Sequence, residues 1–182
     1  MQYQTLLSNL AKVKSGDLIA IDGPAGSGKS TLAKSLVKDL PDSVIIAVDD
    51  LYDGWADAFT PRLTARVIEQ VLLPISKNQE FRYDIYDWHK AKFVKSNVIP
   101  RDQIYILEGV CAGHQSFRGF IDVLIWLDIS DEIGLTRVLN RDGEVIRDQM
   151  LHFQQAQRSH FAQDLTEAAA DYIFDGVPKT IL

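Results

Sequence analysis

The chain has 182 residues, of which 46% are hydrophobic and 24% are charged, a balance typical of a globular protein with a sizeable core. Its 25 acidic and 19 basic residues give a net charge of −6, which argues against nonspecific nucleic-acid binding because that needs a basic surface. The single cysteine, Cys111, excludes an intramolecular disulfide and a CxxC metal site, and its apolar neighbours favour a buried side chain.

The first elements of the chain are a helix, a strand and a second helix. Leucines at helical spacing predict a short helix within residues 3–14. We expect no signal peptide and no membrane span, and therefore a cytoplasmic protein, because no basic leader or long apolar run is visible. Residues 17–22 are predicted to form a strand, and residues 29–40 a helix that ends before Pro41.

Apolar runs predict further strands at residues 43–48, 103–107, 122–127 and 171–174. The run at 43–48 is nearly continuous, which is typical of a strand buried on both faces. Helices are predicted at residues 61–76, after Ser130, and over 144–168. This alternation predicts an α/β fold in three layers, with a five-stranded parallel sheet flanked by helices. Residues 79–100 carry short β-like runs and are predicted to form a hairpin outside that sheet.

The loop between the first strand and the following helix matches the G-x-x-x-x-G-K-[ST] phosphate-binding pattern, so the predicted fold is that of a three-layer P-loop NTPase. Its glycines allow a tight turn whose N–H groups face phosphate oxygens, and the helix N-terminus favours negative charge. Lys29 is expected to reach the β- and γ-phosphates, and the Ser30 hydroxyl to hold Mg²⁺. The predicted nucleotide-binding residues are Gly23, Pro24, Ala25, Gly26, Ser27, Gly28, Lys29, Ser30 and Thr31.

Carboxylates follow two more of the predicted strands. Asp49 and Asp50 come after the strand at 43–48, and Glu108 comes after the strand at 103–107. In parallel α/β sheets ligands bind beyond the carboxyl ends of the strands, so these side chains are expected near the phosphate-binding loop. A solvated or capping role is the alternative for each of them.

Four further segments, in their order along the chain, carry a family resemblance. They are Val48-Asp49-Asp50-Leu51-Tyr52, Tyr86-Asp87-Trp88-His89, Ile106-Leu107-Glu108-Gly109-Val110 and Arg137-Val138-Leu139-Asn140-Arg141-Asp142. Together with the loop they resemble the uridine kinase-like branch of P-loop kinases, which is related to phosphoribulokinase. The resemblance covers nearly the whole chain. It implies one kinase domain over residues 1–182, with a substrate-side excursion at 79–100 and a lid at 137–148.

The resemblance also implies roles for the acidic and basic residues. Asp49 matches the carboxylate that accepts a hydrogen bond from the acceptor hydroxyl, and Asp50 is its competitor. Glu108 matches the acidic residue that contributes, with Ser30, to the Mg²⁺ shell. Arg137 and Arg141, four residues apart on one helix face, match lid arginines that stabilise the transferring phosphoryl group. Exposed ion pairs with neighbouring carboxylates are the alternative for them, and for Arg147, a further candidate on the lid.

The acceptor side is predicted less fully. Tyr52, Tyr86 and His89 match positions where the resembled enzymes bind their substrate, although packing is the alternative for Tyr52 and an ordinary surface position for His89. Trp55 and Trp88 are suited to stacking on a base, with packing again the alternative. The segment at 86–92 is shorter than in uridine kinases, and the lid is short too. The acceptor is therefore not identified by the resemblance.

The leading hypothesis is a Mg-ATP-dependent kinase that phosphorylates a hydroxyl of a nucleoside-like small molecule. Lys29, Asp49, Arg137 and Arg141 are its predicted catalytic residues. One alternative is a P-loop kinase of another acceptor, either pantothenate-like or a sugar phosphate. Another is a nucleotide-dependent ATPase or switch with a protein partner. We expect no nucleic-acid or membrane partner. The sequence leaves open ATP against GTP, the pathway, and whether the chain forms a homo-oligomer.

Overall fold

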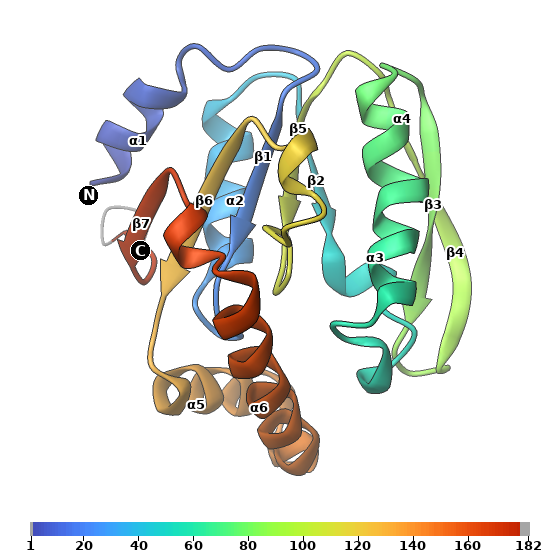
Figure 1. Cartoon of the computed structure of the whole chain (residues 1–182), viewed down its shortest axis with the longest axis vertical. Coiled ribbons are helices and arrows are strands. Elements are labelled where there is room, and N and C mark those ends of the chain that lie inside the picture. The colour runs from blue at the N-terminus through green and yellow to red at the C-terminus, as the bar shows by residue number, and fades with distance from the viewer. Residues whose placement is uncertain (1, 179–182) are drawn as a thin grey trace.

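The computed structural model describes residues 2–178, so residue 1 and residues 179–182 of the predicted domain lie outside the described part. Its centre is a five-stranded parallel sheet in the order β2-β5-β1-β6-β7 (Figure 1). The strands are β1 Leu18–Asp22, β2 Ser43–Ala47, β5 Ile104–Glu108, β6 Val123–Asp128 and β7 Tyr172–Asp175. The predicted α/β fold with five parallel strands is therefore confirmed.

Each face of the sheet carries its own apolar core, because successive side chains of a strand point to opposite faces. In β5, Tyr105 and Leu107 belong to one core and Ile104 and Ile106 to the other. Helices α1 and α2 cover the second of these faces, and a longer helical segment covers the first, which gives three layers. The bounds are α1 Tyr3–Leu10 and α2 Lys29–Asp39.

The helical segment on the other face spans residues 61–76, as predicted, but it is not regular throughout. It comprises α3 Pro61–Val67, a π-helical turn Ile68–Leu72 and α4 Leu73–Ser76. Thr60 caps its start, since its hydroxyl accepts a hydrogen bond from the Leu63 N–H at 3.2 Å. The apolar positions of this segment, including Leu63, pack into the core next to β5.

One expectation about the sheet is wrong. The apolar run at 43–48 predicts a strand buried on both faces, yet only Ile46 of β2 is fully buried. The reason is its place in the sheet: β2 is an edge strand that pairs with β5 alone among the described strands. A central and an edge strand have the same local pattern here, and the difference arises from strand order.

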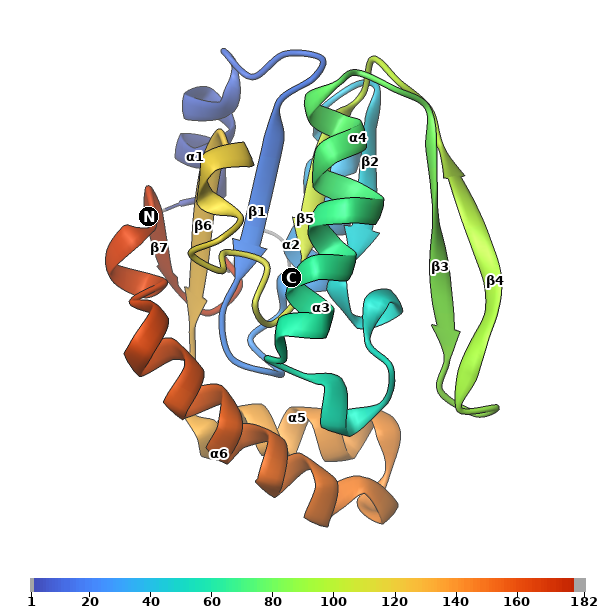
Figure 2. The ribbon, with the colours of Figure 1, turned by 45° about the vertical axis from the view of Figure 1, so that its right-hand side comes forward.

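The predicted hairpin is present and forms a separate sheet. Strands β3 Phe81–Asp87 and β4 Lys92–Ile99 pair antiparallel, with a register shift between Ile85 and Tyr86. Figures 1 and 2 show this hairpin beside the α3–α4 segment, away from the main sheet. Its β3 side contributes Phe81 and Tyr83 to the core around that segment.

Two helices lie beyond the carboxyl ends of the strands, as Figure 2 shows most clearly. They are α5 Asp131–Asp142, which Ser130 caps as predicted, and α6 Arg147–Asp164. A single 3₁₀ turn at Glu144–Ile146 joins them, so the predicted helix at 144–168 is interrupted at both ends. Among residues 2–178, no helix combines the length and apolar character that crossing a membrane requires.

Candidate active site

The phosphate-binding loop connects β1 to α2 through backbone conformations that favour glycine. Gly28, the residue before α2, has φ 99° and ψ 22°, in the left-handed region. Gly23 lies so close to β6 that a Cβ there would stand 2.2 Å from the Leu127 carbonyl oxygen. The loop is therefore held against β6 and delivers the N-terminus of α2 to the carboxyl edge of the sheet.

Lys29 lies at the centre of this arrangement. Its side chain is only 7% exposed, and Nζ donates hydrogen bonds to the carbonyl oxygens of Gly23 and Pro24, each at 2.8 Å. Burial lowers the pKa of Lys29, whereas the nearby charges of Asp22, Asp49 and Glu108 raise it. Three carboxylates on three different strand ends thus surround one ammonium group.

Asp22 is the member of this group that the sequence analysis did not single out. It is completely buried, and its carboxylate accepts hydrogen bonds from the backbone N–H groups of Gly23 (2.7 Å), Cys111 (3.0 Å) and Gly113 (2.8 Å). Burial raises its pKa to about 6, while these hydrogen bonds and the Lys29 charge act in the opposite direction. Asp22 therefore ties the phosphate-binding loop to the segment after β5. The sequence did carry a signal for Asp22, because a charged residue at the end of an apolar strand is unusual enough to suggest a role there.

Asp49 and Glu108 are brought together by strand pairing. Glu108 ends β5 and is paired with Ala47 of β2, and Asp49 follows in the 3₁₀ turn Val48–Leu51. Burial raises the pKa of both carboxyl groups, and the Lys29 charge opposes this in both. The Asp49 residue as a whole remains exposed to solvent, so a small molecule can reach it.

Ser30 lies next to Glu108. Its hydroxyl is hydrogen-bonded to the Glu108 carboxylate, which lowers the pKa of that group against the effect of burial. The hydroxyl at the start of α2 and the carboxylate at the end of β5 are thus neighbours, although 78 positions separate them in the numbering. Asp50, the alternative to Asp49, points its carboxylate at the hairpin, where the Tyr83 hydroxyl donates to Oδ2 at 3.4 Å.

The three candidate arginines differ in their surroundings. Arg137 donates from Nη1 to the carbonyl oxygen of Gly26 in the phosphate-binding loop at 3.2 Å. Hydrogen bonds to Asp142 raise the pKa of Arg141, and the charges of Asp49 and Glu108 add to this.

Arg147 is placed differently. It is exposed and forms a two-point ion pair with Glu144, with distances of 2.7 and 2.9 Å. This is the kind of surface pair that the sequence analysis set against a functional role. The structure thus brings Arg137 to the loop and Arg141 within electrostatic reach of the strand-end carboxylates, while Arg147 pairs within the connection between α5 and α6.

An aromatic cluster stands beside Asp49. The Trp88 ring lies 5.2 to 6.2 Å from the rings of Tyr86, Trp55 and Tyr52, all edge to face. Its indole N–H donates to the Asp49 carbonyl oxygen at 3.3 Å. Trp55 and Trp88 are 39% and 40% exposed, so part of each ring is open to a ligand.

The other predicted acceptor-side residues have different places. Tyr52 and Tyr86 are buried, and the Tyr52 hydroxyl donates to the Val110 carbonyl oxygen at 3.1 Å. His89 lies exposed in the hairpin turn, where its backbone N–H donates to Asp87 at 3.0 Å. The structure therefore gathers the tyrosines and tryptophans into one cluster and leaves His89 at its outer end.

Two further contacts could not be found from local patterns. The buried Gln157 of α6 accepts a hydrogen bond from the Ala25 N–H of the phosphate-binding loop at 2.9 Å. Arg66 of α3 pairs with the buried Asp57 at 2.6 Å and donates to the Leu51 carbonyl oxygen at 2.6 Å. It thereby holds the turn that carries Asp49 against α3.

Arg66→Ala is expected to destabilise the protein by about 1.5–3 kcal/mol, because it leaves the buried Asp57 carboxylate without its cation. Urea denaturation followed by circular dichroism measures this change. Arg62→Ala is the matched control: Arg62 lies on the same helix but is exposed, so its loss should change stability by less than about 0.5 kcal/mol. Equal effects of the two variants would show that the Asp57 pair adds nothing.

Comparisons with known proteins agree with the fold described above. The family model of an AAA domain matches residues 19–160. A uridine kinase of Alkaliphilus metalliredigens is 31% identical over 143 residues, which are 69% of this chain and 68% of the relative. The chain belongs to the uridine kinase-like family of P-loop kinases. The predicted family resemblance is confirmed.

Other similar proteins are longer or more distant in sequence. A uridine kinase of Schizosaccharomyces pombe is 30% identical over 141 residues, but the match covers only 31% of that protein, so the chain spans about a third of its length. A possible uridine kinase from Bacillus stearothermophilus has the same fold, with a TM-score of 0.71, 18% identity and coverage of 94% of this chain and 96% of that one. A proposed fructose transport system kinase of Silicibacter sp. TM1040 is equally similar in fold (TM-score 0.72, 16% identity, 96% and 99% coverage).

Proposed function

We propose that this P-loop kinase transfers the γ-phosphoryl group of ATP to a hydroxyl group of a nucleoside-like acceptor. The observation that carries the proposal is the convergence, at one edge of the sheet, of the Lys29 ammonium, the carboxylates of Asp49 and Glu108, and an open aromatic cluster beside Asp49. The first two are what phosphoryl transfer requires, and the third suits an aromatic base.

The donor side consists of residues 23–31. Their backbone N–H groups and the α2 N-terminus would bind the phosphates, and Lys29 would neutralise charge on the β- and γ-phosphoryl oxygens. Lys29 now donates to two carbonyl oxygens of the loop itself. It would exchange at least one of these hydrogen bonds for a phosphate oxygen when nucleotide binds.

Ser30 and Glu108 fit a magnesium ion. A hydroxyl and a carboxylate offer the hard oxygen ligands that Mg²⁺ prefers, and the two side chains are in hydrogen-bonding contact here. Bound Mg²⁺ would neutralise negative charge on the phosphates. The role of this chain is to hold the two oxygen groups together, with the Lys29 charge nearby.

On the acceptor side, Asp49 would orient the hydroxyl group and take its proton as the new O–P bond forms and the bond to the leaving diphosphate breaks. Trp88 and Trp55, whose rings are partly exposed, would stack on the base. Tyr52 and Tyr86 support these rings from the buried side, and His89 would contact the acceptor from the hairpin turn. Residues 79–100 are thus proposed as the acceptor-side excursion.

The segment 137–148 is proposed as the lid. It comprises the second half of α5 and the turn before α6, which lie beyond the strand ends in Figure 2. Arg137 and Arg141 would reach the transferring phosphoryl group when the lid closes. Arg137 already contacts the phosphate-binding loop, and Arg141 interacts electrostatically with Asp49 and Glu108. Arg147 would have to leave Glu144 to join them.

The remaining parts of the proposal concern the whole protein. Residues 1–182 are proposed to act as a single kinase domain in the cytoplasm, with ATP and a small-molecule acceptor as its ligands and neither nucleic acid nor membrane as a partner. The net charge of −6 agrees with the proposed absence of a nucleic-acid partner.

A coupled assay of ATP consumption over a panel of nucleosides, vitamins, sugars and sugar phosphates tests the proposal. We expect turnover with a nucleoside and at most about a hundredth of that turnover in the Lys29→Ala protein, which serves as the low-activity control. If only pantothenate or only a sugar phosphate were phosphorylated, the proposed nucleoside-like acceptor would be wrong and that compound would take its place. ATP hydrolysis unaffected by every acceptor would contradict the kinase proposal.

A further inference from the structure

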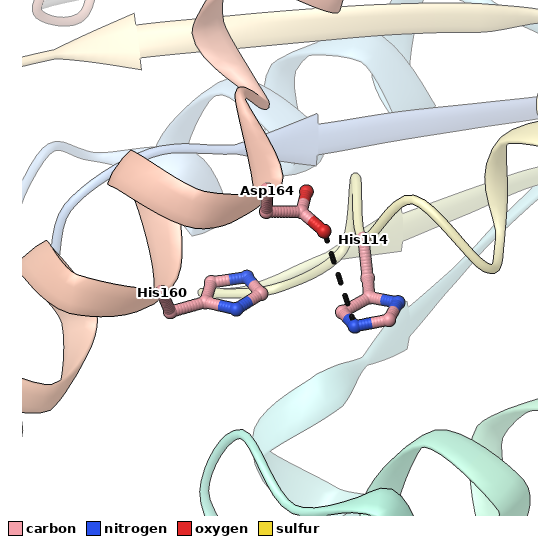
Figure 3. Close-up of side chains that lie close together, drawn as sticks. All are labelled: His114, His160 and Asp164. Atoms are coloured by element: carbon pink, nitrogen blue, oxygen red, sulfur yellow. Dashed lines mark ion pairs between the residues drawn. The ribbon is translucent and has the colours of Figure 1, made fainter.

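Three side chains with metal-binding chemistry lie together outside the candidate active site. They are His114, from the segment that follows β5, and His160 and Asp164, which are four residues apart on the last turns of α6 (Figure 3). Each offers one ligand atom, and the three atoms all lie within 4.8 Å of one another. Because positions i and i+4 of a helix share a face, α6 presents two of the ligands side by side.

The Nε2 atoms of both imidazole groups make no hydrogen bond among the described residues. The Nε2 atom of His160 is buried and has no hydrogen-bond partner among the described residues. The Nε2 atom of His114 lies 3.9 Å from Oδ1 of Asp164, too far for a hydrogen bond. The two rings stack with their planes 7° apart and their centroids 5.5 Å apart. Burial lowers the pKa of both imidazole groups, and a metal ion binds imidazole in its neutral form.

Asp164 is held by contacts typical of a metal-binding carboxylate. Its Oδ2 atom accepts hydrogen bonds from Arg118 Nη2 and from the Thr166 hydroxyl, both at 2.6 Å. Its Oδ1 atom, on the side of His114, accepts only the Gln115 N–H at 2.9 Å among the hydrogen bonds of the described residues. One lone pair of Oδ1 therefore remains for a cation, while the Arg118 charge is engaged on the other oxygen.

We propose that His114, His160 and Asp164 bind a divalent transition-metal ion of the Zn²⁺ type, which fastens the end of α6 to the segment after β5. Two imidazole nitrogens and one carboxylate oxygen form a ligand set suited to Zn²⁺ and its first-row neighbours, whereas Mg²⁺ prefers oxygen alone. Bonds of about 2.0–2.1 Å would draw the three ligand atoms closer than they now lie.

Binding at Nε2 of His114 places the ring proton on Nδ1. That atom now accepts a hydrogen bond from the Ser116 N–H at 3.0 Å, which would be released. Ser116 is exposed, so its amide can bind water instead. An open surface hollow of about 380 Å³, lined by His114 and Ser116 together with residues of α3, leads to this side of the cluster. It gives an ion a route of entry and leaves room for water as a further ligand.

Such an ion would act on the phosphate-binding loop through the backbone. The segment that carries His114 also supplies the Cys111 and Gly113 N–H groups that bind Asp22 at the base of the loop. The metal would therefore brace the same connection, without contacting the nucleotide site.

Calorimetric titration of the full chain, without a histidine tag, with Zn²⁺ and separately with Co²⁺ tests the proposal. The chain has four histidines, and the two outside the cluster, His89 and His152, are exposed. We expect one equivalent of Zn²⁺ or Co²⁺ to bind in an excess of Mg²⁺, with visible absorption bands for Co²⁺. His114→Gln and His160→Gln should each weaken binding by at least about tenfold. His152→Gln is the matched control on the same helix and should leave binding unchanged.

A second measurement needs no variant. In nitrogen-15 NMR spectra of the wild-type protein, Zn²⁺ should shift the imidazole signals of two of the four histidines and leave the other two in place. The proposal is overturned if Zn²⁺ and Co²⁺ do not bind saturably. It is also overturned if the signals of His89 or His152 shift instead, or if His152→Gln weakens binding as much as His160→Gln.

Discussion

Lys29→Ala is expected to lower the rate of phosphoryl transfer by at least about 10²–10³-fold, the typical cost of removing one group that stabilises transition-state charge. Lys29 is the only one of the candidate cations that is buried at the loop, with its ammonium group among the carboxylates of Asp22, Asp49 and Glu108. The measurement is kcat/KM for ATP with the acceptor found in the screen.

Two further variants separate catalysis from folding. Lys29→Met keeps most of the apolar volume of the side chain and should be as inactive as Lys29→Ala. Lys38→Ala removes an exposed lysine from the last turn of the same helix and should retain wild-type activity. If both Lys29 variants are folded but lose less than about tenfold, or about 1.4 kcal/mol of activation free energy, the assignment of Lys29 is wrong.

Asp49→Asn should lower kcat by about 10²–10⁴-fold and leave the affinity for ATP nearly unchanged, because the amide keeps the size of the side chain but cannot accept the proton. Asp50→Asn is the matched control. The Asp50 carboxylate accepts a hydrogen bond from Tyr83 of the hairpin, so a change there should have a much smaller effect on kcat. If Asp50→Asn lowered kcat more than Asp49→Asn does, Asp50 rather than Asp49 would be the residue that accepts the proton.

The pH dependence of kcat gives an independent test of Asp49. Burial raises its pKa, so the carboxylate becomes protonated at a higher pH than the ordinary value of about 3.9. Since the active form is the carboxylate, kcat should fall as the pH decreases through this raised pKa. This fall of kcat at low pH, the acid limb of the profile, should shift in Asp49→Asn and stay at the same pH in Asp50→Asn. An unchanged limb in Asp49→Asn would assign it to another group, such as Glu108 or Asp22, whose pKa burial also raises.

Much of the fold was predictable because its signals are local. Each of the five strands is an apolar run bounded by turn residues, and the hairpin at 81–99 alternates as a two-stranded sheet does. The order of the strands has no such signal. Consequently the half-exposed β2 was expected to be buried, because an apolar run has the same composition at the edge of a sheet as at its centre.

The candidate site divides in the same way. Lys29, Ser30, Asp49 and Glu108 could be named because they stand in a motif or directly after a strand. Gln157, Arg66 and Asp57 could not, since each acts through a partner that is distant in the sequence or is one polar residue among many on a helix or turn.

The amino-acid sequence by itself determined that the chain has a phosphate-binding loop, a parallel α/β fold and carboxylates at the strand ends, because spacing and periodicity along the chain carry this information. Only the tertiary structure decided which side chains meet. It enclosed Lys29 among three carboxylates, placed Trp88 beside Asp49 and brought His114 to His160 and Asp164. Such meetings depend on strand order and helix packing, through which residues far apart in the sequence come into contact.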